Sequence, residues 1–149
     1  MTGAAPVTSE ARPPSPPTER GTVIVLISDL FFSVNIRVTL RRLGYNAVLT
    51  RSIGEVSDGL ASGDVRLVVV DGTAVDTGES WERIGQIAAS GIPVLVFGPH
   101  KEVETLRAAK MAGVTRVVAN SQFHREMPVL VERYALNSPS QDGDAETTE

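Results

Sequence analysis

The feature that most constrains the fold is a short apolar run that ends in an acid, Arg66-Leu-Val-Val-Val-Asp71. Four consecutive apolar residues, three of them β-branched, predict a strand buried on both faces, as strands are in a parallel sheet. A second run, Thr22-Val-Ile-Val-Leu-Ile-Ser-Asp29, also ends in an aspartate. Ligands and chemistry collect beyond the carboxyl ends of such strands, so both carboxylates are expected at one edge of the sheet.

Strand and helix patterns alternate along the chain. Apolar residues at helical spacing predict four helices, at Leu30–Leu43, Ser52–Ala61, Ser80–Ala89 and Glu102–Ala112. A last helix is expected to begin near Glu126, because Pro128 suits a first turn. Further strands are predicted at Asn46–Thr50, Ile92–Phe97 and Val114–Ala119.

This alternation predicts an α/β fold of the flavodoxin-like type: a five-stranded parallel sheet, order 2-1-3-4-5, with helices on both faces. That order places the first and third strands side by side. Asp29 and Asp71 are therefore expected to meet at the carboxyl edge.

Composition divides the chain into one domain and two tails. Residues 1–20 are rich in proline, and residues 138–149 are polar and acidic, so both are predicted to be disordered around a domain at 21–137. A Pro-rich ligand for another protein's groove is the functional alternative for the first tail. The domain segment holds twelve basic and twelve acidic residues, which is no footprint for nucleic acid.

Several classes of function and location are disfavoured. The chain has no cysteine, which excludes disulfides and thiolate chemistry. It shows neither a secretory signal nor an apolar stretch of the roughly 20 residues that a membrane span needs, so we expect a cytoplasmic protein without membrane contact. Gly-rich phosphate loops, a serine elbow and zinc-ligand spacing are missing from the sequence, which disfavours a small flavodoxin-like enzyme or cofactor binder.

Local patterns spread over most of the chain carry a family resemblance. They are Val68-Val-Val-Asp71, Arg41-Arg-Leu-Gly-Tyr45, Pro93-Val-Leu-Val-Phe-Gly98 and Thr105-Leu-Arg-Ala-Ala-Lys-Met-Ala-Gly113. From Val23 to about Ala135 the chain resembles a response-regulator receiver (CheY-like) domain. The resemblance implies that Asp71 accepts a phosphoryl group from a histidine kinase, beside a Mg²⁺ ion held by Asp29, Asp71 and the backbone of Thr73.

The chain departs from the family pattern at the positions that stabilise and sense the phosphoryl group. One acid of the pair after the first strand is replaced by Ser28, and Gly98 replaces a hydroxyl residue. Val117 replaces the aromatic switch residue, and Asn120 replaces the lysine. Losing one such stabilising donor costs about 3 kcal/mol of transition-state stabilisation. His100 and Lys101 are candidate substitute cations.

These departures favour an atypical receiver, or pseudo-receiver: a stand-alone signalling module, not an enzyme, with phosphorylation of Asp71 weak or absent and only weak Mg²⁺ binding. The alternative is a working phospho-acceptor that uses Asp71 with Mg²⁺. Expected partners are a histidine kinase, a downstream signalling protein or a second copy in a homodimer. Candidate contact residues are Lys101, Glu104, Arg107 and Phe31.

Some residues also have purely structural interpretations. Asp29 stands where an N-cap of the first helix would be, and capping explains it as well as metal binding does. Phe31 and Phe32 cannot both face the core, because helical neighbours point about 100° apart. Trp81 is expected in the core, whereas His100 and His124 are expected on the surface.

Overall fold

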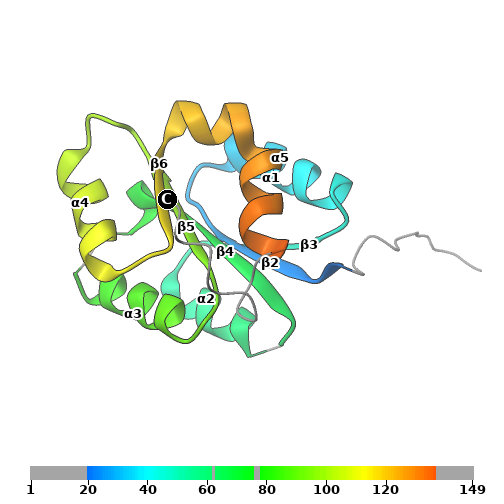
Figure 1. Ribbon diagram of the computed structural model, residues 1–149, viewed down its shortest axis with the longest axis horizontal. Helices are drawn as coiled ribbons and strands as arrows, with labels where there is room; N and C mark the ends of the chain where they lie inside the picture. Colours follow the sequence, from blue (N-terminus) through cyan, green and yellow to red (C-terminus); the bar gives the residue numbers. More distant parts are fainter. Residues whose placement is uncertain (1–19, 62, 76–77, 137–149) are drawn as a thin grey trace, which may run out of the picture.

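The computed structural model describes residues 20–61, 63–75 and 78–136 (Figure 1). The predicted disordered tails lie outside these ranges, apart from Arg20. Within the described ranges, no helix is both long and apolar enough to cross a membrane.

Five parallel strands form one sheet, and their order confirms the predicted fold class. The strands are β2 (Thr22–Leu26), β3 (Asn46–Thr50), β4 (Val65–Asp71), β5 (Val94–Gly98) and β6 (Arg116–Ala119). They lie in the order β3-β2-β4-β5-β6, which is 2-1-3-4-5 in chain order, and every pair is parallel. The first and third strands are neighbours, as the sequence predicted.

Helices cover both faces of the sheet. They are α1 (Leu30–Arg42), α2 (Ile53–Leu60), α3 (Gly78–Ala89), α4 (Val103–Ala112) and α5 (Asn120–Leu136), with a short 3-10 turn η2 at Gly72–Ala74. Buried side chains of α1 and α5 form one core layer, and those of α2, α3 and α4 form the other. Figure 1 shows the same division, with α1 and α5 together on one side.

Successive side chains of each strand point to opposite faces of the sheet, so one strand contributes to both core layers. In β2, Val23 and Val25 face α1 and α5, whereas Ile24 and Leu26 face the opposite helices, and all four are buried. Full burial of one such side chain contributes roughly 1.5–3 kcal/mol. Trp81 joins the second layer, which confirms its predicted place in the core.

The last helix differs from the prediction. It begins at Asn120, six residues before the predicted start near Glu126, and breaks at Glu126, where φ is −116° and ψ is 17°. Pro128 has no N–H to donate to the carbonyl of His124, so the helix bends at this point. The predicted helix corresponds to the part after the break, and the part at 120–125 was missed.

A glycine sets the spacing between α3 and α4. A Cβ added to Gly85 would overlap the carbonyl oxygen of Ala112, the last residue of α4. We expect Gly85→Ala to lower the free energy of unfolding by roughly 1–3 kcal/mol, because the added methyl group forces the two helices apart. Urea unfolding followed by circular dichroism measures this change.

The matched control is Gly78→Ala in the same helix, where an added Cβ has no atom of the described residues within 4 Å. Its free energy of unfolding should be unchanged or slightly raised, since alanine favours helix over glycine. Equal destabilisation by both substitutions would contradict steric contact with α4 as the cause.

Candidate functional site

The strand register places the predicted site residues at one edge of the sheet. Asp71 ends β4 and lies opposite Phe97 of β5, and Gly98 lies opposite Ala119 at the end of β6. Residues 27–29 leave β2 at the same edge, since Leu26 pairs with Val70. The candidate site is therefore built by segments that follow four adjacent strands.

Asp71 is held in a fixed orientation by its own turn. The side chain is only 6% exposed. Its Oδ1 accepts two hydrogen bonds from Thr73, one from the hydroxyl at 2.7 Å and one from the backbone N–H at 2.9 Å. Hydrogen bonds to an ionised acceptor are stronger than neutral ones, which offsets the cost of burying the carboxylate. Within the described residues, Oδ2 has no hydrogen-bond partner.

The hydroxyl of Thr73 was not predicted to act in the site. Only the backbone carbonyl of Thr73 was expected in the site, as a ligand of the metal ion. A threonine two residues after an aspartate that ends a strand is a local turn signal, and that signal could have identified the contact.

Asp29 caps α1. Its Oδ1 accepts hydrogen bonds from the backbone N–H groups of Phe31 at 2.8 Å and Phe32 at 3.3 Å. The capping interpretation is confirmed, and the metal-ligand role stays a prediction. The described part of the chain contains no group of three or more acidic, histidine or cysteine side chains arranged to hold a metal ion.

The prediction that His124 lies on the surface is wrong. Its ring stacks on Phe32 of α1 at 4.4 Å between centroids, and it meets Phe97 and Phe123 edge-on at 5.7 and 5.3 Å. Its Nε2 is buried and has no hydrogen-bond partner among the described residues. Burial lowers the pKa of His124, while the nearby charges of Asp71 and Asp29 act in the opposite direction.

The three predicted switch positions carry an amide, a glycine and an apolar side chain, at Asn120, Gly98 and Val117. Asn120 is half-buried, and its Oδ1 has no partner in the described ranges. A Cβ added to Gly98 would lie 3.3 Å from Cδ2 of Leu106, so this side chain of α4 adjoins the position of the missing hydroxyl group. Val117 is half-buried and packs against the core layer beneath α2, α3 and α4.

The predicted contact residues are all exposed. Lys101, Glu104 and Arg107 are exposed in α4 or just before it. Phe31 is 83% exposed, whereas Phe32 packs inward, which confirms that only one of the two phenylalanines faces the core. His100 is exposed, as predicted. Phe31 belongs to α1 on one face of the sheet, whereas Glu104 and Arg107 belong to α4 on the other.

The lowered pKa of His124 predicts a pH-dependent stability. At this residue the unfolded chain, with a pKa near 6.5, binds a proton more readily than the folded one. The free energy of unfolding should therefore fall as pH decreases through 6.5 toward the folded-state pKa. Urea unfolding between about pH 5 and 8 measures this free energy. His124→Gln should remove the part of its pH dependence that comes from His124.

His100→Gln is the control for His124→Gln, because His100 is exposed in a loop. This variant should keep the pH dependence of stability that comes from His124. An NMR titration of His124 with a midpoint at or above 6.5 would contradict the effect of burial.

Comparison with known proteins adds the fold family. The chain matches no protein-family model and no curated protein sequence. Among solved structures, the signal receiver domain of an HD domain-containing protein from Pseudomonas fluorescens is similar, with 20% identity and a TM-score of 0.66, over 80% of this chain and 96% of that one. A response regulator from Thermotoga maritima has 16% identity and a TM-score of 0.64, over 78% of this chain and 98% of that one.

A third similar structure is the receiver domain of the sensor histidine kinase PA1611 from Pseudomonas aeruginosa, with a magnesium ion coordinated in its active-site cleft. It has 14% identity and a TM-score of 0.65, over 77% of this chain and 97% of that one. Strand order and these similarities agree, and the described residues adopt the fold of response-regulator receiver domains, the CheY-like form of the flavodoxin-like architecture.

Proposed function

We propose that this chain is a receiver-type module of two-component signalling that acts through protein–protein contact, with phosphorylation of Asp71 weak or absent. The fold supports the signalling class, and the residues around Asp71 support the weak phosphorylation. No enzymatic activity is proposed.

The observation that carries this proposal is the bonding of Asp71. Among the described residues, the hydrogen bonds to its side chain come from Thr73 alone, and its carboxylate has no ion pair. Phosphoryl transfer to a carboxylate builds negative charge on the transferred oxygens, which fixed cationic donors stabilise. The neutral amide of Asn120 cannot supply that charge. His124 is driven toward its neutral form by burial.

The surroundings of Gly98 and Val117 support a weak response to any phosphorylation that occurs. Gly98 has no side chain to bind a phosphoryl oxygen, and Leu106 adjoins its position. Val117 is held in apolar packing and has no ring to reorient. A ligand shifts a conformational equilibrium only through different affinities for the two states, and these residues offer no such difference.

The alternative is a working phospho-acceptor. It is favoured by one observation: Asp71 is oriented by Thr73 through Oδ1, while Oδ2 has no partner among the described residues. Oxygen ligands suit Mg²⁺, so Asp71, Asp29 and the backbone carbonyl of Thr73 would hold the ion, which neutralises charge on a transferred phosphoryl group. The magnesium-bound receiver domain from P. aeruginosa supports this candidate.

The proposed partner is a histidine kinase, a downstream signalling protein or a second copy of the chain. Lys101 just before α4 and Glu104 and Arg107 on α4 present both signs of charge, and Phe31 presents an aromatic ring on α1. Exposed aromatic and charged side chains of these types anchor and orient protein–protein contacts.

Mg²⁺ is expected to bind weakly, because Ser28 stands in place of one acid and affinity for hard cations depends on the number of charged ligands. Titration of the protein with Mg²⁺, followed by NMR, measures the affinity. Asp29→Asn should weaken binding further while it keeps the cap of α1, since asparagine caps as well as aspartate. Ser28→Asp should tighten it. Tight binding that survives Asp29→Asn would show that Asp29 is not a ligand.

Beryllofluoride with Mg²⁺ is expected to leave the conformation of the domain nearly unchanged. The coupling free energy should fall below the roughly 1–3 kcal/mol typical of allosteric links, because Gly98, Val117 and Asn120 cannot follow the phosphoryl mimic. The measurement compares amide spectra of the wild type and Asp71→Ala, each with and without the mimic. Large shifts that require Asp71 and extend to α4 and β6 would establish the alternative, a phosphorylation switch.

A further inference from the structure

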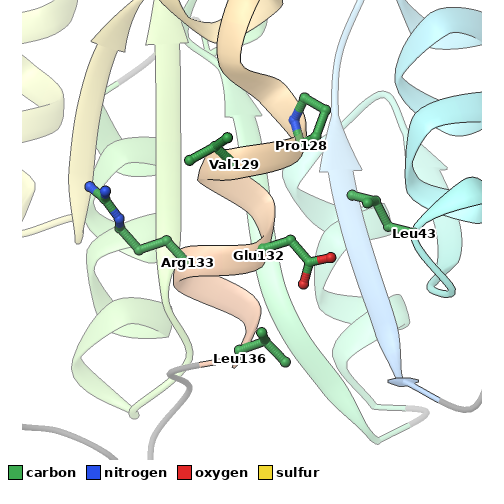
Figure 2. Close-up of a pocket in the computed structure, with 6 residues that line it drawn as sticks. All are labelled: Leu43, Pro128, Val129, Glu132, Arg133 and Leu136. Carbon is green, nitrogen blue, oxygen red and sulfur yellow. The ribbon is translucent and has the colours of Figure 1, made fainter.

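A groove lies between the second half of α5 and the end of α1. Its volume is about 560 Å³. The lining residues are Leu43, Pro128, Val129, Glu132, Arg133 and Leu136. Figure 2 shows Leu43 on one wall and the α5 residues on the other. Val129 and Leu136 are 59% and 57% exposed, so the groove presents apolar surface to solvent.

The first described residue is anchored to both walls of this groove. Nη1 of Arg20 donates to the backbone carbonyl of Leu43 at 2.6 Å. The guanidinium group also forms a paired contact with the Glu132 carboxylate, at 3.0 and 2.9 Å, and lies over the ring of Tyr45. This contact raises the pKa of Arg20, so the anchor stays charged. Arg20, where the described part of the chain begins, therefore lies at the groove.

The segment immediately before Arg20 has the composition and the length to fill the groove. It contains four prolines, Pro13, Pro14, Pro16 and Pro17. The eight-residue step from Pro128 to Leu136 spans about 12 Å of helix, and roughly four residues of polyproline II cover that length. The last proline is three positions before Arg20, so the segment reaches the groove without a long linker.

We infer that the groove binds the chain's own Pro13–Pro17 segment. Proline rings offer apolar surface to Val129 and Leu136, and a Pro-rich segment loses little conformational entropy on binding because it is already extended. The segment is joined to Arg20 through the backbone, so the contact is intramolecular. The effective concentration of the segment at the groove is then in the millimolar range. The acidic segment after Leu136 fits less well, since Pro139 and Ala145 are its only apolar residues.

The absence of cysteine allows a direct test on the full chain. A spin label is attached at Ser15→Cys, and relaxation enhancement is measured at the amides of Val129, Arg133 and Leu136. We expect strong enhancement there that falls several-fold when all four prolines are replaced by serine, a change that keeps the tether length. Enhancement that is unaffected by this replacement would reflect the tether alone and would overturn the inference.

A second pair of variants tests the groove itself. Val129→Glu introduces a charge into the groove at an exposed position and should reduce the enhancement several-fold. Met111→Glu, at an 80% exposed position on α4, is the matched control and should preserve it. Both substitutions are on the surface, where effects on stability are small. Equal loss, or no loss, in the two variants would overturn the groove as the binding site.

Two further samples separate the other occupants. In one sample, spin-labelled protein without isotope enrichment is mixed with isotope-enriched protein that carries no spin label. Relaxation enhancement at the groove in this mixture would come from a second copy and would overturn the intramolecular contact. A label at Ser140→Cys reports the segment after Leu136. Proline-independent enhancement from this label, with none from Ser15→Cys, would assign the groove to the acidic segment instead.

Discussion

The structure depends on the burial of β4 on both faces. Five consecutive residues, Leu67 to Asp71, are buried, so helices must cover both sides of the sheet and strands must flank β4 on both edges. The two flanking strands are β2 and β5. A carboxylate at the end of such a strand has little access to water, and the turn at Thr73 satisfies it through Oδ1. The burial of β4 (Val65–Asp71) thus determines both the layers of the fold and the surroundings of the acid that ends the strand.

The sheet and most helices could be predicted because their signals are local. Apolar runs and helical spacing predicted the strands and helices, and the strand order of a flavodoxin-like fold predicted that Asp29 and Asp71 share one edge. The stretch at 120–125 could not be predicted, because Phe123 is its only large apolar residue. Its helical form depends on tertiary packing, in which the ring of Phe123 stacks on Phe97 at 4.1 Å. His124 lies in the same stretch, and its contact with Phe32 of α1 likewise depends on packing between residues far apart in the sequence.

Other parts of the site depend on contacts between residues far apart in the sequence. The approach of Leu106 to Gly98 requires the packing of α4 on the sheet, which no local pattern encodes. Arg20 follows a Pro-rich segment and was grouped with it, yet it pairs with Glu132, 112 positions away. Whether Asp29 and Asp71 bind a metal ion together stays a prediction, since capping accounts for the observed position of Asp29.

The break at Glu126 divides α5 into two parts. The part at 120–125 carries His124, whose pKa responds to the charge of Asp71, and the part at 127–136 supplies most of the buried side chains of α5. Pro128 interrupts the backbone hydrogen bonding that would otherwise make them one rod. Buried side chains on both sides of the break, Phe123 before it and Met127, Leu130 and Val131 after it, nevertheless belong to one core cluster. A substitution in the first part that moves Phe123 would therefore reach the packing of the second part against α1, so the surroundings of the acid and the hydrophobic core constrain each other.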